Sequence, residues 1–199
     1  MVRAVLFDIG GVLVALDGVP SMARLLNVAA AHDVIHDIWM TSPAVVAHET
    51  GRLSAVDFAA GVVADLNLPI TPALFLQDFC AWPRFVLDGA FELLDDIPQE
   101  YTIAALSNTS AVHWERIGAL GLAGRFAHAY LSHEMGCLKP SDEAFQIALD
   151  GLGLAPSDVV FLDDGVRNVA AAGRLGMRAH LTKNPGEARR VLHEYGVVR

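Results

Sequence analysis

The chain has 199 residues, of which 53% are hydrophobic and 19% charged, and its formal net charge is −9. This composition excludes a disordered chain and supplies ample apolar material for a buried core. The acidic excess argues against nucleic-acid binding, which needs clustered lysine and arginine. The length fits one domain with a large insertion, or two small domains.

Neither the cysteines nor the apolar stretches indicate an exported or membrane protein. Cys80 and Cys137 are too few for a disulfide framework, so we expect reduced thiols and a cytoplasmic location. The longest stretch without a charged residue, residues 101–114, is shorter than the ~18 apolar residues that a membrane-spanning helix requires. The first apolar run ends at Asp8, too early for a secretion signal. We expect no membrane contact.

Short apolar runs that end in polar residues predict buried parallel strands. The predicted strands cover residues 4–7, 102–106 and 159–162, with weaker patterns at 127–132 and 178–182. Helical patterns alternate with them and cover residues 111–120, 141–152 and 166–175. This alternation predicts an α/β fold, a Rossmann-like parallel sheet flanked by helices.

Residues 15–87 differ from the rest of the chain. They show no strand pattern, and their helical stretches are broken at Pro43, Gly51, Pro69 and Pro72. We expect an all-helical insertion after the first strand, with residues 1–14 and 88–199 forming the Rossmann-like core.

Polar residues follow three of the predicted strands, where ligands bind in a parallel sheet. They are Asp8, then Ser107 with Asn108, then Asp163 with Asp164. Lys139 lies in a loop just before a predicted helix. Carboxylates, a hydroxyl and an ammonium at one edge indicate a divalent metal with a phosphate group, because Mg²⁺ prefers hard carboxylate oxygens.

Four segments carry a family resemblance. They read VLFDIGGVLV, ALSNTS, CLKPSDEAF and VVFLDDGVRNVAAAGRLGM, in this order. Together they resemble the four motifs of the haloacid dehalogenase superfamily of hydrolases, over residues 4 to about 181. The helical insertion resembles that family's helical cap. The resemblance implies Mg²⁺-dependent hydrolysis of a small phosphomonoester, such as a sugar phosphate. We expect a monomer or a homodimer.

The resemblance also implies a role for each site residue. Asp8 matches the nucleophile that forms an aspartyl-phosphate, and Lys139 matches the lysine that stabilises the transferring phosphoryl group. The implied phosphate-binding residues are Ser107, Asn108 through its backbone, and Gly11. The implied metal ligands are Asp8, Gly10 through its carbonyl, Asp164 and Asp163.

Position 10 departs from the resemblance. The family's phosphatases usually carry a second aspartate there, which acts as general acid and then as base, and this chain has Gly10. A positioned acid or base contributes ~10²–10⁴-fold to the rate. One alternative is that another group takes the role of this acid and base: water, Asp17, or one of His32, His36 and His48. Another is that the substrate has a leaving group that needs little protonation. Alternatively, the chain is a catalytically impaired phosphate-binding module. A phosphotransferase also remains open, although Gly10 counts against it.

Several other side chains are candidates for substrate contacts, with packing or solvated roles as the competing interpretation. They are Trp39, Glu49, Arg52, Trp82 and Arg84 in the insertion, and His113 with Trp114 after the second motif. The dehalogenating branch fits less well, because the resemblance implies an arginine after its nucleophile and residues 9–16 contain none.

Overall fold

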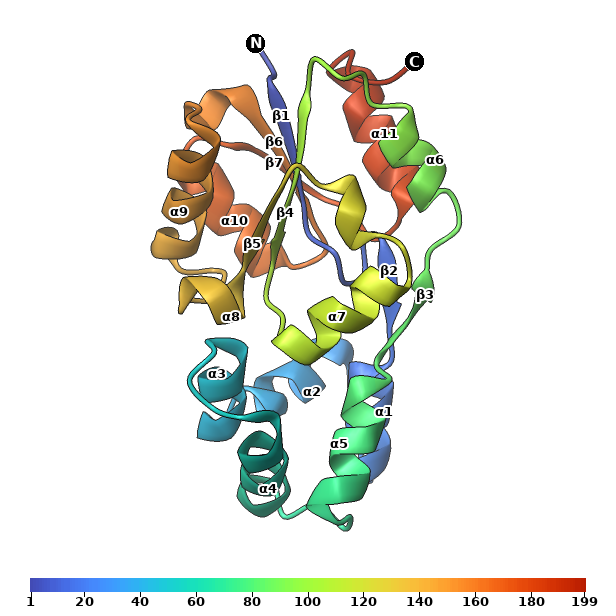
Figure 1. Ribbon diagram of the computed structural model, residues 1–199, viewed down its shortest axis with the longest axis vertical. Coiled ribbons are helices and arrows are strands. Elements are labelled where there is room, and N and C mark those ends of the chain that lie inside the picture. Colours follow the sequence, from blue (N-terminus) through green and yellow to red (C-terminus); the bar gives the residue numbers. More distant parts are fainter.

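The structure, a computed structural model, describes residues 1–199 except the side chain of His32. Its centre is a five-stranded parallel sheet in the order β5-β4-β1-β6-β7 (Figure 1). The strands are β1 (Ala4–Phe7), β4 (Thr102–Ser107), β5 (His128–Leu131), β6 (Val159–Asp163) and β7 (Arg178–Leu181). All five predicted strands are confirmed, each within one residue of its predicted ends.

Helices cover both faces of this sheet, as predicted. On one face lie α6 (Ala90–Asp95), α7 (Ala111–Ala119) and α11 (Pro185–Glu194), and on the other lie α9 (Asp142–Leu152) and α10 (Val166–Arg174) (Figure 1). Short helical turns occupy α8 (Ser132–Met135), η1 (Ala123–Arg125) and η2 (Pro156–Asp158). The β1 side chains alternate between two buried clusters, Val5 and Phe7 in one and Ala4 and Leu6 in the other. A strand buried on both faces needs apolar residues throughout, which explains its continuous apolar run.

Five helices form a separate group beyond the carboxyl end of the sheet, and we call them the helical unit (Figure 1). They are α1 (Gly18–Leu26), α2 (His32–Trp39), α3 (Pro43–Glu49), α4 (Ala55–Asp65) and α5 (Pro72–Cys80). Packed aromatic rings fill its centre, including Phe58 and Phe79, whose centroids lie 4.7 Å apart. The predicted helical insertion after the first strand is therefore confirmed.

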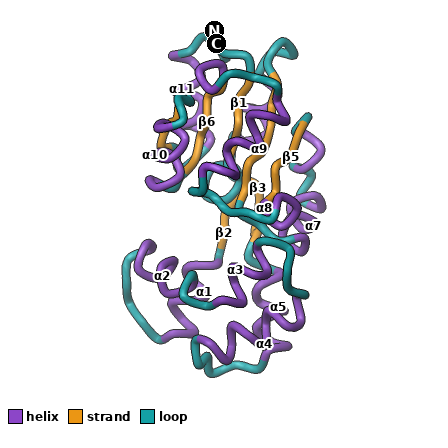
Figure 2. Tube along the Cα trace, turned by 90° about the vertical axis from the view of Figure 1, so that its left-hand side faces the viewer, coloured by secondary structure: helices purple, strands orange, loops and turns teal.

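Two short strands that the sequence analysis did not predict join the sheet to the helical unit. β2 (Val14–Leu16) and β3 (Pro83–Val86) pair antiparallel, so the expectation that residues 15–87 contain no strand is wrong. Strands of three and four residues are too short to show a period, and Pro83 weakens the pattern further. Because both connections run side by side, they hold the helical unit against the sheet edge where the site residues lie (Figure 2).

The remaining expectations concern membranes and thiols. Among the described residues, no helix combines the length and the apolar character needed to cross a bilayer. Cys80 and Cys137 carry free thiols.

Candidate functional site

The three middle strands of the sheet bring the predicted site residues together. Ser107 and Asp163 are the last residues of β4 and β6, and Asp8 directly follows β1, which lies between those strands. The Asp8 backbone N–H donates to the Leu162 carbonyl at 2.8 Å, which extends the strand pairing by one residue. Asp8 is therefore fixed by the sheet itself.

Lys139 is buried beneath these strand ends between two carboxylates. Its Nζ donates to Asp8 Oδ1 at 2.9 Å and to Asp163 Oδ2 at 2.6 Å, and its side chain is 1% exposed. Burial alone would lower the pKa of Lys139, but the charges of Asp163 and Asp8 overcome this effect and raise it. A buried ammonium needs such partners, so the three side chains form one unit.

Asp163 is completely buried, and each of its carboxylate oxygens already has partners. Oδ1 accepts from the Gly165 backbone N–H at 2.7 Å and from Asn168 Nδ2 at 2.9 Å. Oδ2 accepts from Lys139 Nζ, and from Asn168 Nδ2 at 3.2 Å. Asp163 thus positions Lys139 and the start of α10. Its predicted role as a metal ligand stays a prediction.

The carboxylates of Asp8, Asp163 and Asp164 form a compact cluster, with one oxygen of each within 4.8 Å of the others. Burial raises the pKa of Asp8 to about 7, with Lys139 opposing this shift and the charges of Asp163 and Asp164 adding to it. When all are ionised, three carboxylates outweigh the one ammonium. Without a cation, this surplus would repel a phosphate dianion. The donor set therefore fits a divalent, oxygen-preferring cation such as Mg²⁺.

Two glycines allow the backbone after β1 to turn under this cluster. Gly11 has a φ of +73°, and a Cβ atom there would lie 2.1 Å from Asp164 Oδ2. A Cβ atom at Gly10 would lie 2.4 Å from Cδ1 of Leu16. The Asp164 carboxylate thus takes space that only a glycine leaves free.

Asn108 fixes the loop that carries Lys139. The Asn108 side chain accepts from the Lys139 backbone N–H and donates to the Lys139 carbonyl, both at 2.8 Å. The Asn108 side chain thus ties the Lys139 loop to the end of β4. The Ser132 hydroxyl holds the next residue, Thr109, by accepting from its N–H at 2.9 Å and donating to its carbonyl at 3.0 Å.

A cavity of about 440 Å³ lies between this cluster and the helical unit. The predicted site residues on its wall are Asp8, Gly10, Ser107, Asn108, Lys139 and Asp164. Asp163 lies behind Lys139, and Gly11 lies against Asp164. The sheet edge therefore supplies a polar floor to the cavity.

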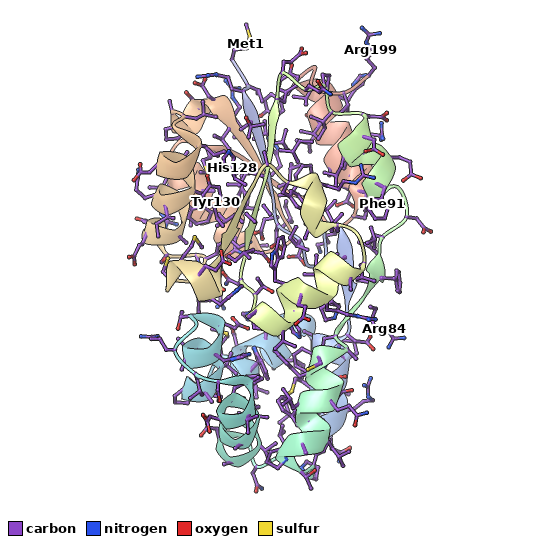
Figure 3. All side chains as sticks on the ribbon, viewed as in Figure 1. Met1, Arg84, Phe91, His128, Tyr130 and Arg199 are labelled. Atoms are coloured by element: carbon purple, nitrogen blue, oxygen red, sulfur yellow. The ribbon has the colours of Figure 1, made fainter. Side chains whose placement is uncertain are left out.

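The candidates for a substitute acid or base differ in whether they line the cavity. His36 lines the cavity. Asp17 instead forms an ion pair with Arg84 at 2.7 Å, at the outer edge of the junction between β3 and the helical unit (Figure 3). His48 is buried, with Nδ1 2.9 Å from the Leu53 carbonyl. The side chain of His32 lies outside the described residues.

The candidates for substrate contacts also differ in whether they line the cavity. Trp39, Glu49, Trp82 and His113 line the cavity, whereas Arg52, Arg84 and Trp114 are not part of its wall. Burial raises the pKa of Glu49 to about 7, against the opposing effect of a hydrogen bond from Trp39. Sequence reasoning gave these residues less weight because aromatic and acidic residues on helices more often pack or face solvent.

His113 joins the two parts of the molecule. Its Nε2 lies 2.7 Å from the Phe79 carbonyl, and because a carbonyl only accepts, Nε2 carries the proton. The imidazole also stacks on the Phe79 ring at 4.0 Å. Burial lowers the pKa of His113 to about 4, so the ring is neutral near pH 7.

Comparison with known proteins agrees with this geometry. A family model described as haloacid dehalogenase-like hydrolase matches residues 2–176. A D-ribitol-5-phosphate phosphatase from Bacteroides thetaiotaomicron is 26% identical over 203 residues, covering 96% of this chain and 97% of that protein.

Solved structures share the fold. A predicted HAD-like family hydrolase from Porphyromonas gingivalis superimposes with a TM-score of 0.78 and 24% identity, over 100% of both chains. A HAD family enzyme from Bacteroides thetaiotaomicron, in complex with magnesium and inorganic phosphate, gives a TM-score of 0.73 at 21% identity, over 91% of this chain and 94% of that one.

Proposed function

Because the chain belongs to the haloacid dehalogenase-like hydrolases, we propose that it is a magnesium-dependent phosphatase acting on a small polyol or sugar phosphate. The observation that carries this proposal is the buried Lys139 ammonium, which bridges Asp8 and Asp163 at the floor of the cavity. The activity named for the curated relative, on ribitol 5-phosphate, supports the substrate class.

Asp8 acts as the nucleophile in this proposal. A bond forms between one of its carboxylate oxygens and phosphorus while the bond from phosphorus to the alcohol oxygen breaks. The leaving alkoxide takes a proton from water. A second water molecule then attacks phosphorus, the bond from phosphorus to the Asp8 oxygen breaks, and inorganic phosphate and the free Asp8 carboxylate result. Lys139 holds Asp8 in place and supplies positive charge to the transferring group.

The other strand ends bind the phosphate group. The Ser107 hydroxyl and the backbone N–H of Asn108, both just before α7 on the cavity wall, donate to the phosphate oxygens, since the start of a helix favours an anion. Asp8 and Asp164 would hold Mg²⁺, with Asp163 beside them. The Gly10 carbonyl, on the same cavity wall, would be a further ligand. When bound, the ion neutralises phosphate charge and orients the phosphate for in-line attack.

The helical unit acts as a cap that selects the substrate and limits water. It forms the far wall of a cavity of about 440 Å³, which suits a metabolite rather than a protein substrate. The free thiols of Cys80 and Cys137 suit a reducing, cytoplasmic compartment.

Phosphate release tests the proposal. Wild type should release phosphate from p-nitrophenyl phosphate and from ribitol 5-phosphate with Mg²⁺, and lose this activity with EDTA. Asp8→Asn should abolish release from both substrates, whereas Asp88→Asn, at an exposed position off the cavity wall, should leave it unchanged.

The same assay addresses the alternative of a phosphate-binding module. If neither substrate nor a wider panel releases phosphate, while inorganic phosphate and Mg²⁺ still bind together in calorimetry, the phosphatase proposal is wrong and Gly10 marks a lost activity.

A further inference from the structure

The cavity wall formed by the helical unit is mostly apolar. Its larger side chains include Met22, Ile35, Trp39 and Phe79, and Trp82 adds to them just after α5. Among the described residues of this unit that line the cavity, Glu49 is the one carboxylate, and no lysine or arginine accompanies it. The wall therefore offers aromatic and aliphatic surface with one acidic group and one imidazole, that of His36.

The carboxyl group of Glu49 has few partners inside the protein. Trp39 is its one hydrogen-bond donor among the described residues, with Nε1 3.5 Å from Oε1, at the long limit for such a bond. A carboxylate offers about four acceptor sites, so most of those of Glu49 face the cavity without a protein donor. Burial also raises the pKa of Glu49, which agrees with a group that is short of donors. A bound ligand would supply those donors.

The position of Glu49 is held by a rigid aromatic cluster. Trp39, which donates to it, packs against Trp82 with centroids 5.3 Å apart and stacks on Phe79 at 6.3 Å. Glu49 lies at the end of α3, whose following turn packs tightly against the His133 backbone, because a Cβ atom at Gly51 would lie 2.2 Å from the His133 carbonyl. The backbone that carries Glu49 and the indole that donates to it are thus held by packing.

This arrangement matches the alcohol part of a polyol phosphate. Hydroxyl groups donate to a carboxylate, and the C–H faces of a carbon chain pack on indole rings. A second anionic group would instead meet the Glu49 carboxylate, which is ionised above its pKa of about 7. Arg52 and Arg84, the arginines among the candidate substrate contacts, are not part of the cavity wall.

We propose that Glu49 is the specificity-determining residue of this site, accepting hydrogen bonds from hydroxyls of the substrate's alcohol part and excluding substrates with a second anionic group. This proposal rests on the phosphatase function proposed above.

Substrate pairs that share a phosphate end test it. We would measure kcat/KM with Mg²⁺ for ribitol 5-phosphate, for pentyl phosphate, which lacks the hydroxyls, and for a phosphorylated sugar acid. The variant is Glu49→Gln, which keeps the acceptor for Trp39 but removes the charge and one acceptor oxygen. Glu115→Gln, the same change at an exposed position on α7, is the matched control.

Wild type should prefer ribitol 5-phosphate. Glu49→Gln should lower kcat/KM for ribitol 5-phosphate by about 10- to 100-fold, the range for a hydrogen bond to a charged group. The value for pentyl phosphate should change by less than about threefold on the same scale. The phosphorylated acid should become a better substrate, and Glu115→Gln should match wild type throughout.

Three results would overturn the proposal, and they point to different causes. An equal loss on ribitol 5-phosphate and pentyl phosphate would mean that Glu49 serves the fold or the chemistry. Unchanged values on all three substrates would leave the phosphatase function intact but remove Glu49 from substrate selection. If wild type hydrolyses none of the substrates, the phosphatase function fails, and the role of Glu49 fails with it.

Discussion

A methyl group of Leu16 occupies the space into which a side chain at Gly10 would point, with Cδ1 2.4 Å from the position of a Cβ atom. Leu16 is the last residue of β2, and both residues line the cavity. The place of the family's second aspartate is therefore filled by an apolar side chain. Because the overlap involves the end of a flexible side chain and not the backbone, it can be relieved by substitution.

The double variant Gly10→Asp/Leu16→Ala should therefore gain activity. A carboxyl group beside the reacting phosphate can protonate the leaving oxygen, and such catalysis is worth ~10²–10⁴-fold in established cases. We expect kcat for ribitol 5-phosphate to rise at least about tenfold. The rate for p-nitrophenyl phosphate should change much less, because its leaving group needs little protonation.

The single variants separate the effect of the opened space from the effect of the added carboxyl group. Leu16→Ala opens the space without adding an acid, so it should not raise kcat for ribitol 5-phosphate. Gly10→Asp alone must displace Leu16 and should gain less than the double variant. If the double variant is no faster on ribitol 5-phosphate than Leu16→Ala, another group already supplies the proton.

Gly11→Ala should weaken Mg²⁺ binding and activity together. Its Cβ atom would lie 2.1 Å from Asp164 Oδ2, so the carboxylate must move out of the cluster. We expect the Mg²⁺ concentration for half-maximal activity to rise at least about tenfold, the equivalent of about 1.4 kcal/mol. Titration of activity with Mg²⁺ measures this shift.

Gly196→Ala is the matched control for this prediction. Gly196 also has a positive φ, +70°, but a Cβ atom there meets nothing within 4 Å. It should lose stability through backbone strain alone and keep the Mg²⁺ dependence of wild type. The same shift in Mg²⁺ dependence for both variants would show that strain, not the displaced carboxylate, causes the effect.

His113 should make the protein less stable in mild acid. In the unfolded chain, histidine binds a proton below its ordinary pKa of 6.5, whereas burial lowers the pKa of His113 to about 4 in the folded protein. Between these values the unfolded state binds more protons, so the free energy of unfolding falls as the pH falls from 6.5 to 4. Allowing for partial exposure of the ring, the loss is about 2 kcal/mol.

Urea unfolding of wild type and His113→Gln at several pH values tests whether the free energy of unfolding falls as the pH falls. Gln can still donate to the Phe79 carbonyl but does not titrate, so other groups cancel in the difference between the two proteins. The advantage of wild type over the variant should shrink as the pH falls through this window. A difference that does not change with pH would contradict the assignment of a neutral, buried imidazole.

The strand ends could be predicted from the sequence because their signal is local. Asp8, Ser107 and Asp163 each follow an apolar run directly, and the parallel sheet then brings those ends to one edge. Lys139 could be assigned only through its motif, since no local pattern brings it to Asp8, 131 residues earlier.

Contacts between distant segments could not be predicted in this way. Asn108 was expected to bind phosphate through its backbone, and nothing in the sequence shows that its side chain holds the Lys139 loop 31 residues away. Likewise, the sequence offers Asp17 as a candidate acid but does not show that it pairs with Arg84, which lies 67 residues further along the chain. The packing of the whole helical unit decides whether an acidic residue lines the cavity or instead pairs with an arginine.

An exposed ion pair joins the helical unit to the sheet part of the molecule. Arg167 Nη1 and Nη2 lie 3.1 Å and 3.2 Å from the two carboxylate oxygens of Asp37, linking α10 to α2. His36, beside Asp37, lines the cavity. The pair therefore favours the arrangement in which the helical unit lies against the site.

Arg167→Ala should raise KM while barely changing stability. Exposed ion pairs contribute at most about 1 kcal/mol, so KM for ribitol 5-phosphate should rise by no more than about fivefold. The wild-type KM should also rise with salt, which screens the pair, whereas the variant should depend on salt less. The charge exchange Arg167→Asp/Asp37→Arg should restore KM, and Asp33→Ala, one turn earlier on α2, should not alter it. If the exchange variant behaves like Arg167→Ala, the guanidinium of Arg167 acts on the substrate side and not through Asp37.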